Sequence, residues 1–559
     1  MKLKYRLLIL VLALIVVAAT WVAWNWPRRV DMAQYAPADS MIYLECNNVV
    51  AVTEGITGSD GWKRFAASFG LRARQSSDRW LYLAASLGLA PAQSVILSRA
   101  QVAVVMLNLD AAEENSTLSI KPEGAIIIET HTAGWRTKPA AEAALQQFAE
   151  RMYGPVTAKH SWEDADYLEW SPAAGDRKIV AVIDGSLVVV GNSKRAVQKC
   201  LEARRKPESS LRDDAALRQM RTKMGAAQSL TFGYVSAGNA TRLVSWAAPL
   251  LFGREPGDST LQQIVARNAA RILGSIGWSS RAAAGGIEDR FFLTLEPSVV
   301  SRLRPAFRTS QPKQSVWTVA PGKLEAITVY KSQTPALAWE ALRAVSGQFD
   351  ALSAVFFGSI MNSALLPYGI ENPDRFLKAV GPDVATLRVS PQSEGSVLIA
   401  RALDRPALEQ MFKTQRSHNP KDGGTIDFEL ADAPDKKFAA AFLDDYFLVG
   451  GRDDVRACVD ARINGQTVAG NGLTKPATLA VESTAAIVTY SNDAERVRGF
   501  FSAVGSLRAV SANDSVAATT GAEIPFATTE TNLEDQGLDR RTRSAFGQFS
   551  TLIGLLKHE

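Results

Sequence analysis

Cysteine is scarce in this sequence. Its 559 residues contain three cysteines, Cys46, Cys200 and Cys458, and so small and odd a set excludes a disulfide framework. Cys200 falls on the apolar i, i+3, i+4 face of an expected helix, together with Val197 and Leu201. We therefore expect Cys200 to be a small buried hydrophobe and not a reactive thiol.

The residue patterns of common active sites are also missing. None of the four histidines (His131, His160, His418 and His558) stands at metal-ligand spacing to another histidine or a cysteine. No phosphate-binding loop and no G-x-S-x-G nucleophile motif occurs. The sequence therefore predicts no metal, no cofactor and no catalytic residue, and favours a protein that is not an enzyme.

Acidic pairs offer the one alternative with chemistry. Asp444, Asp445, Asp453 and Asp454 flank one short expected strand. Aspartate at such places usually forms turns and helix caps through local hydrogen bonds. A carboxylate pair of a hydrolase is the less favoured interpretation.

Charge of one sign is not in large excess. The 62 basic and 57 acidic residues leave a net charge of +5, and no run of five or six like charges occurs. Because nucleic-acid binding needs a concentrated positive surface, nucleic acid is not expected as a partner.

Only one long apolar run is present, at the N-terminus. Basic residues precede it, and it extends over residues 7–26, a length that matches the hydrocarbon core of a bilayer. Its tryptophans would lie at the membrane interface. The sequence thus predicts that residues 1–30 form an uncleaved single-pass inner-membrane anchor with the bulk of the chain periplasmic; the alternative is a signal peptide cleaved after Ala19. The expected anchor residues are Leu7, Leu10, Ile15, Trp21, Trp24 and Trp26.

Landmarks in the remaining sequence occur twice in the same order. The segment 183–191 and the helix after it, with Val197 and Cys200, are matched by 443–451 and a helix with Val455 and Cys458. The offset between matched landmarks decreases steadily along the chain, as expected for a duplicated copy that has lost short loops. We predict two domains, 35–305 and 316–559, joined by a linker at 306–315.

Strands and helices mix without strict alternation within each copy. Expected hairpins at 178–191 and 272–295 indicate antiparallel pairing, and Asp184-Gly185 is typical of a two-residue hairpin turn. The predicted fold class is α+β: two tandem similar domains, each a largely antiparallel curved sheet covered by helices, after one transmembrane helix.

Some expected helices are apolar nearly all round. Helices of this kind usually pack inside a core. The alternative is a groove for a lipid tail or a partner helix, whose lining would include Trp80, Trp246, Phe252, Phe356 and Phe357.

Two segments carry a resemblance to known proteins. The run from Pro37-Ala38-Asp39-Ser40 to Leu44, followed by Asn47, and the hairpin 183–191, followed by Lys194-Arg195-Ala196-Val197, resemble an uncharacterised family of exported bacterial proteins, catalogued only as a domain of unknown function. The resemblance implies a bacterial cell envelope location and one N-terminal membrane segment. It supplies no catalytic residue.

Three functions are compatible with these patterns. The favoured one is a non-enzymatic, membrane-tethered envelope protein that binds or scaffolds an unknown protein partner between its two similar domains. The second is a carrier or sensor of a hydrophobic ligand such as a lipid. The third is an envelope hydrolase that uses an acidic pair.

Overall fold

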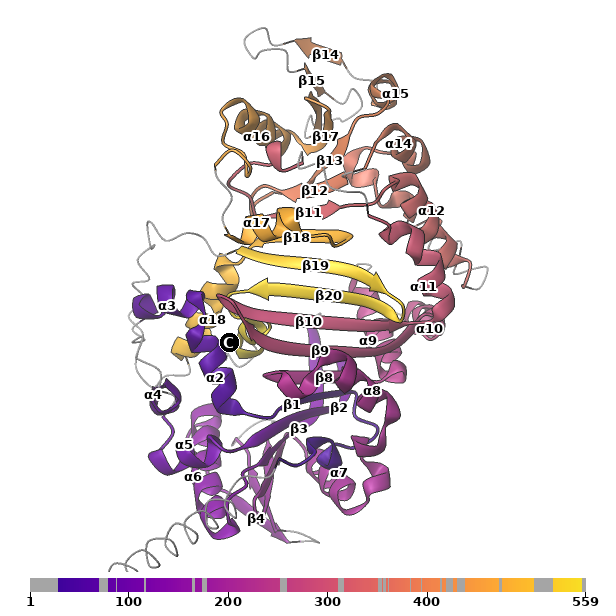
Figure 1. The fold of residues 1–559 in the computed structure, drawn as a ribbon. Coiled ribbons are helices and arrows are strands. Elements are labelled where there is room, and N and C mark those ends of the chain that lie inside the picture. The colour runs from indigo at the N-terminus through magenta and orange to yellow at the C-terminus, as the bar shows by residue number, and fades with distance from the viewer. Residues whose placement is uncertain are drawn as a thin grey trace, which may run out of the picture. The chain divides into compact units, whose positions relative to one another are not determined.

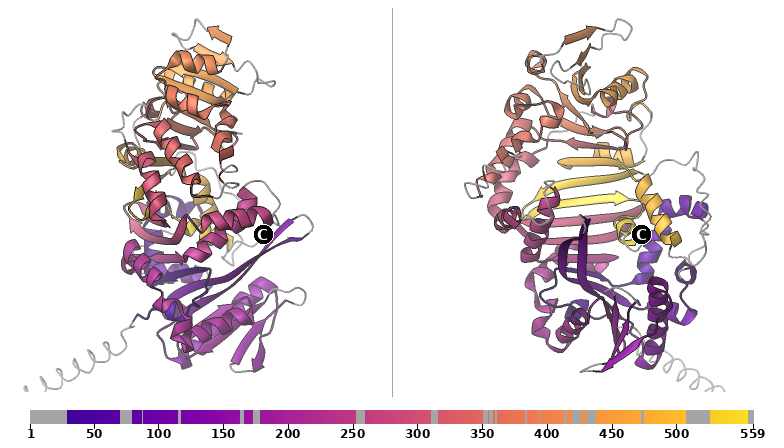
Figure 2. Two further views of the ribbon diagram at one scale, coloured as in Figure 1. Left: turned by 90° about the vertical axis from the view of Figure 1, so that its right-hand side faces the viewer. Right: turned by 180° about the vertical axis from the view of Figure 1, so that it is seen from behind.

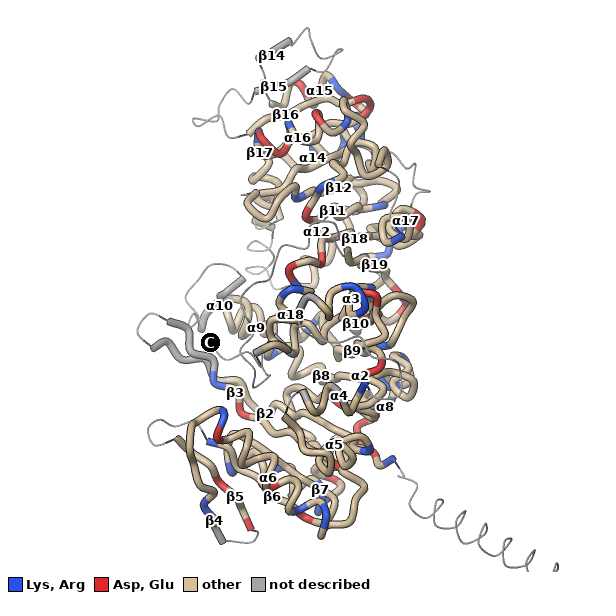
Figure 3. Tube along the Cα trace, turned by 90° about the vertical axis from the view of Figure 1, so that its left-hand side faces the viewer, with Lys and Arg blue, Asp and Glu red and all other residues tan. Residues whose placement is uncertain are grey.

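The computed structural model describes the chain from residue 29 to residue 554, with gaps. The described residues are 29–69, 79–86, 88–114, 117–162, 166–172, 178–251, 259–309, 316–349, 354, 358–359, 361–382, 384–393, 395–412, 415–418, 426–429, 438–471, 475–506 and 526–554. Basic and acidic positions are interspersed along the trace, with both kinds on the short helix Asp60–Phe65 (Figure 3).

The chain forms two compact units. Unit 1 comprises Met1–Val50, Leu89–Asn108 and Pro122–Asp214, and unit 2 comprises Ala51–Gly88, Leu109–Lys121 and Ala215–Glu559. Each unit is therefore built from segments that are not consecutive in the sequence.

Unit 1 is built on an antiparallel sheet. The strands pair in the order β1-β2-β3-β7-β6-β5-β4. Their bounds are β1 Ile42–Cys46, β2 Gln101–Glu114, β3 Thr117–Glu129, β4 Lys159–Trp162, β5 Asp166–Trp170, β6 Ile179–Asp184 and β7 Leu187–Gly191. The end of β2 and the start of β3, within Leu109–Lys121, are counted with unit 2. The helices are η1 Met32–Tyr35, α5 Pro91–Leu97, α6 Gly134–Tyr153, α7 Lys194–Arg205, η4 Pro207–Ser209 and η5 Leu211–Asp213.

The hairpin of β6 and β7 forms close to the predicted position. Asp184 pairs with Leu187, so the two-residue loop is Gly185-Ser186, one residue later than the predicted Asp184-Gly185. Gly185 takes the positive φ of 63° that this turn needs. The helix that follows, α7, starts where Ser193 accepts a hydrogen bond from the Ala196 main-chain N–H.

Unit 2 contains a longer antiparallel sheet. The strands pair in the order β8-β9-β10-β20-β19-β18-β11-β12-β13-β17-β16-β15-β14. Their bounds are β8 Thr231–Val235, β9 Leu273–Ala283, β10 Gly286–Leu295, β11 Ala326–Tyr330, β12 Val384–Arg388, β13 Val397–Arg401, β14 Gln415–His418, β15 Ile426–Glu429, β16 Phe438–Leu443, β17 Tyr446–Gly451, β18 Ile487–Asn492, β19 Phe526–Glu534 and β20 Gly537–Ser544.

Helices flank this sheet, and Figure 1 shows its central strands β9, β10, β20 and β19 side by side. The helices are α2 Val49–Gly58, α3 Asp60–Phe65, η2 Ala66–Phe69, α4 Arg79–Ser86, α8 Ala215–Met224, η6 Ala226–Gln228, α9 Ala237–Leu251, α10 Ser259–Ala269, α11 Pro297–Leu303, η7 Arg304–Phe307, η8 Val316–Thr318, α12 Pro335–Ser346, η9 Leu366–Tyr368, α14 Pro373–Ala379, α15 Arg405–Met411, α16 Arg452–Ile463, α17 Lys475–Glu482, α18 Ala494–Ser506 and α19 Phe549–Gly554.

The pairing of β10 with β20 corrects the predicted fold class. Residues 287–294 of β10 pair with residues 537–544 of β20, although the two strands belong to the two different predicted domains. The predicted halves thus share one sheet in unit 2, and the two tandem sheet domains of the prediction are wrong. The likeness of β6-β7-α7 to β16-β17-α16 is a local one and does not divide the chain into domains.

Both faces of the sheet are covered around β13, β16 and β17. Val397 and Ile399 face a core with Cys458 of α16, whereas Leu398 and Ala400 face a second core with Phe376 of α14. Strands buried on both faces lose the alternation of apolar and polar residues. This explains the continuous apolar runs in this part of the sequence.

The predicted membrane anchor is also corrected. No helix among the described residues is long and apolar enough to cross a bilayer, which contradicts the prediction of a single-pass inner-membrane protein. The six anchor residues (Leu7, Leu10, Ile15, Trp21, Trp24 and Trp26) lie outside the described part of the chain.

Candidate functional site

Unit 2 contains a cavity of about 470 Å³ at the edge of its central strands, here called the pocket. Five segments line it: α3, the turn between β9 and β10, the first half of α17, the start of β19 and the end of β20. The lining residues are Asp60, Gly61, Arg64, Phe65, Ala283, Ala284, Gly285, Gly286, Ile287, Lys475, Pro476, Leu479, Phe526, Thr528, Arg543, Ser544 and Ala545.

Short-range packing holds α3 against the strands. Ser59 caps α3 by accepting a hydrogen bond from the Trp62 main-chain N–H, and the Asp60 N–H donates to the Gly285 carbonyl at 2.9 Å. Gly285 takes a positive φ of 83°, which the tight turn between β9 and β10 requires. One wall of the pocket is thus tied to the hairpin opposite.

An aromatic cluster beneath α3 supports this wall. Trp62 packs edge-on and tilted against Phe500 and Phe501 of α18, and Phe500 stacks on Phe546 with ring centroids 4.1 Å apart. Large buried rings contribute much of the stability of such a core. The view from behind in Figure 2 shows the yellow-orange helix α18 at the ends of the central strands.

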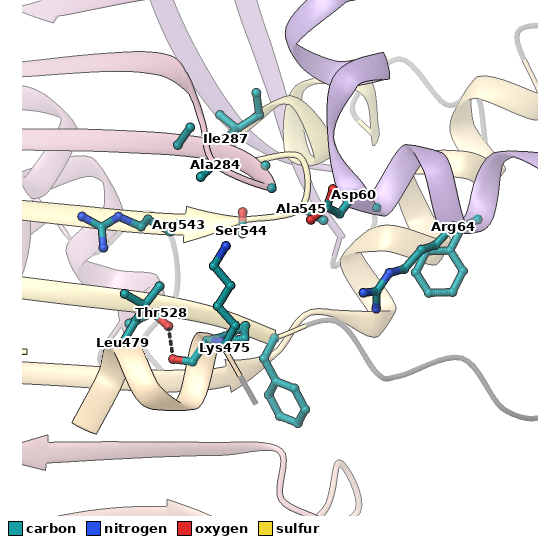
Figure 4. A pocket seen from close by; sticks show the side chains of 17 residues that line it. Asp60, Arg64, Ala284, Ile287, Lys475, Leu479, Thr528, Arg543, Ser544 and Ala545 are labelled. Carbon is teal, nitrogen blue, oxygen red and sulfur yellow. Dashed lines mark hydrogen bonds between the residues drawn. The ribbon is translucent and has the colours of Figure 1, made fainter. Parts of the chain in front are cut away.

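The pocket lining is rich in positive charge. Arg64, Lys475 and Arg543 stand against one carboxylate, Asp60, and Asp60 also pairs with Lys63 at 3.3 Å. Figure 4 shows Lys475 extending from the first turn of α17 toward Ser544, while Asp60 and Arg64 come from α3 on the other side. Lys475 makes no ion pair with any described residue, so its charge is available to a ligand.

The charge of Arg543 is already used within the sheet. Its Nε donates to Glu288 Oε2 at 2.9 Å, and Arg281 also bonds this carboxylate. Burial alone would raise the pKa of Glu288, but the hydrogen bonds from Arg543 and Arg281 outweigh it and lower that pKa. Arg543 is therefore held in place as a fixed part of the wall.

The rest of the lining is apolar or has its hydroxyls occupied. Phe65, Leu479 and Phe526 supply apolar surface. Thr528 Oγ1 donates to the Pro476 carbonyl at 3.2 Å (Figure 4), and Ser544 Oγ accepts from the Gly547 N–H at 3.0 Å. No histidine or cysteine is among the described lining residues.

The residues of the predicted apolar groove lie elsewhere. Trp80 is on α4 and Trp246 on α9, both half-buried, and neither lines the pocket. Phe252, Phe356 and Phe357 lie outside the described residues. The groove therefore stays a prediction.

Three of the four acidic residues of the predicted hydrolase alternative have local partners, and the fourth, Asp453, is exposed in the first turn of α16. Asp444, at a positive φ of 54° in the turn between β16 and β17, pairs with Arg462 at 2.9 Å, and Asp445 pairs with Arg401 at 3.5 Å. Asp454, in the first turn of α16, accepts a hydrogen bond from Ser393 at 2.8 Å.

Sequence reasoning missed the pocket. The glycine-rich run 55–61 matches no phosphate-binding motif, yet Asp60 and Gly61 are pocket residues. Lys475 stands in no motif. Searches against family models, curated proteins and solved structures found no significant match, so the resemblance to an uncharacterised exported family stays a prediction.

Proposed function

We propose that this protein is a non-enzymatic binding protein whose pocket takes a small organic anion with an apolar part. The observation that carries the proposal is Lys475, an exposed cation without an ion-pair partner among the described residues, which lines the same pocket as the apolar side chains of Phe65, Leu479 and Phe526. A ligand anion would supply the missing partner, and its apolar part would cover these side chains.

The volume of the pocket limits the class of ligand. A cavity of about 470 Å³ lies in the range of small-molecule sites, which is roughly 300–1,000 Å³. This favours a ligand with one anionic group and one ring system or short chain. The proposal is a narrower form of the hydrophobic-ligand hypothesis drawn from the sequence, because it specifies the charge and the size of the ligand. The partner-binding hypothesis requires a surface between two separate domains.

The test is binding of 8-anilinonaphthalene-1-sulfonate, an aromatic sulfonate whose fluorescence rises in apolar surroundings. We expect Lys475→Glu to weaken binding about tenfold or more, because a charge-assisted contact contributes roughly 1.5–3 kcal/mol. Lys378→Glu is the matched control: Lys378 is an exposed lysine on α14, outside the pocket, and its variant should bind like the unchanged protein.

A competition experiment distinguishes the contribution of the ligand's charge from that of its apolar part. Decanoate should displace the probe better than decanol, which has a chain of the same length without the charge. Equal displacement by both, or equal loss of binding in Lys475→Glu and Lys378→Glu, would contradict the proposal.

A further inference from the structure

One wall of the pocket is a corner of main chain, residues 544–548, that leads from β20 into α19. Two of its residues, Ser544 and Ala545, line the pocket. From the protein side, the Ala545 N–H donates to Asp493 Oδ2 at 3.2 Å and the Gln548 N–H donates to Asp289 Oδ2 at 2.8 Å. Two buried carboxylates thus hold this corner from behind.

The two carboxylates differ in whether the second oxygen, Oδ1, accepts a hydrogen bond. Asp289 accepts a second hydrogen bond from Ser280 on its Oδ1, which favours its ionised form, although burial raises the pKa of Asp289 to about 6. Asp493 Oδ1 is buried and has no hydrogen bond from any described residue. Asp493 can therefore take a proton on Oδ1 while Oδ2 still accepts from Ala545.

The surroundings of Asp493 leave its charge poorly compensated. The residue is 2% exposed, and burial raises its pKa to about 6, against the opposing effects of Arg496 and of the Ala545 hydrogen bond. Arg496 Nε lies 3.5 Å from Oδ1, and the Arg496 side chain is half in solvent, which weakens its effect through screening.

Other charged groups surround the corner. Glu325 lies close to Asn492, the residue before Asp493, because Asn492 Nδ2 donates a hydrogen bond to Glu325 Oε2 at 3.3 Å. On the pocket side are Asp60 and Arg64 of α3, which packs on Ala545 through Gly61, and Arg543 of β20. Of these, Arg543 is paired with Glu288.

We propose that an organic anion entering the pocket is bound together with a proton, which Asp493 takes up from solvent on its Oδ1. This inference rests on the proposed function. A ligand anion near Lys475 and Ser544 adds negative charge on one side of the corner, while ionised Asp493 lies on the other. Because like charges repel strongly where water is excluded, the complex favours neutral Asp493. The only covalent bond that forms in the protein is the O–H bond at Asp493 Oδ1, and the proton comes from solvent.

Linkage fixes the sign of the pH dependence. If ligand binding raises the affinity of Asp493 for a proton, protonation raises the affinity for the ligand by the same factor. Anion binding should therefore strengthen as the pH falls from 7.5 to 5. We expect the repulsion between the ligand anion and ionised Asp493, which lie on the two sides of the corner, to change Kd about fivefold.

The test uses the full chain and 8-anilinonaphthalene-1-sulfonate, whose sulfonate stays ionised over this pH range. We expect Kd to be about fivefold lower at pH 5 than at pH 7.5, with net proton uptake in calorimetry at pH 6.5 in buffers of different ionisation enthalpy. Asp493→Asn, which can still accept from the Ala545 N–H, should bind at both pH values with the low-pH affinity and without proton uptake. Asp453→Asn, an exposed aspartate at the start of α16, should keep the pH dependence.

The outcomes separate the two proposals. Probe binding that depends on Lys475 but has the same Kd at both pH values, with no proton uptake, would overturn the coupling and leave the proposed function standing. Proton uptake that persists in Asp493→Asn would also overturn the coupling. Absence of probe binding at both pH values would overturn both proposals.

Discussion

Burial at single positions decides the chemistry of the cysteines. Cys200 of α7 and Cys458 of α16 are 1% and 0% exposed, which confirms the prediction of a small buried hydrophobe at Cys200. Burial raises the pKa of Cys200 to about 12 and raises that of Cys458 further. Cys46 is only partly buried, although burial raises its pKa too.

We expect the cysteines to differ in reactivity because the thiolate is the reactive form and must be reached by the reagent. In the native protein at pH 8, iodoacetamide should label Cys46 before Cys200 and Cys458. All three should react in guanidinium chloride. Mass spectrometry of peptides after timed labelling measures this order, and equal native labelling of Cys200 and Cys46 would contradict it.

At the scale of elements, close approach of main chains fixes strand pairing. A Cβ added to Gly286 would lie 2.2 Å from the Ser544 carbonyl oxygen, and no side chain can give way there because the obstacle is main chain. Only glycine lets the start of β10 and the end of β20 meet at the pocket. The same pairing sets the distance between the β9–β10 turn and the corner 544–548.

Gly286→Ala should therefore separate the ends of β10 and β20. We expect a loss of about 1–3 kcal/mol in the free energy of unfolding, measured by urea denaturation, together with weaker probe binding. Gly238→Ala in α9 is the matched control, since a Cβ there meets nothing within 4 Å and alanine favours a helix. A Gly286→Ala protein as stable as the unchanged one would show that the strands can shift at no cost.

At the scale of the whole molecule, the pairing of β10 with β20 joins the two predicted domains in one sheet of unit 2. β10 and β20 come from segments about 250 residues apart in the sequence, yet eight consecutive residues of each are paired. Charged side chains reinforce the pairing: Arg290 bonds Asp539 at 2.6 Å and Arg543 bonds Glu288 at 2.9 Å. A cut in the region of the expected linker would leave both strands with an exposed edge.

Fragments 35–305 and 316–559 should therefore fail to fold independently. An unpaired β20 exposes main-chain donors and acceptors and invites aggregation. We expect fragment 316–559 to aggregate, or to lack the protease resistance of its strands in the full chain, as measured by limited proteolysis and size-exclusion chromatography. A soluble monomer with the cooperative unfolding of the intact protein would contradict this.

Local features were predicted from the sequence because they depend on near neighbours. The turn at Gly185, the helix with Cys200 and the hairpin 272–295 follow from residue preferences over a few positions. Residues 511–529 are rich in serine, threonine and alanine, a composition that predicts a loop. Residues 511–525 lie outside the described part of the chain, but the prediction is wrong from Phe526 onward, where the segment forms β19 and pairs with a strand on each side. Threonine fits both a polar loop and a strand, and only its neighbours decide between them.

The sequence alone determined the local hairpins and capped helices. Its few cysteines, small net charge and lack of catalytic motifs are likewise properties of the sequence by itself. The tertiary structure decided that the two halves share a sheet, because strand pairing depends on partners far away in the chain that no local pattern names. It also decided the pocket, where Asp60, Lys475 and Ser544 meet from three distant segments. The burial that raises the pKa of Asp493 arises only once the corner 544–548 and α18 pack together.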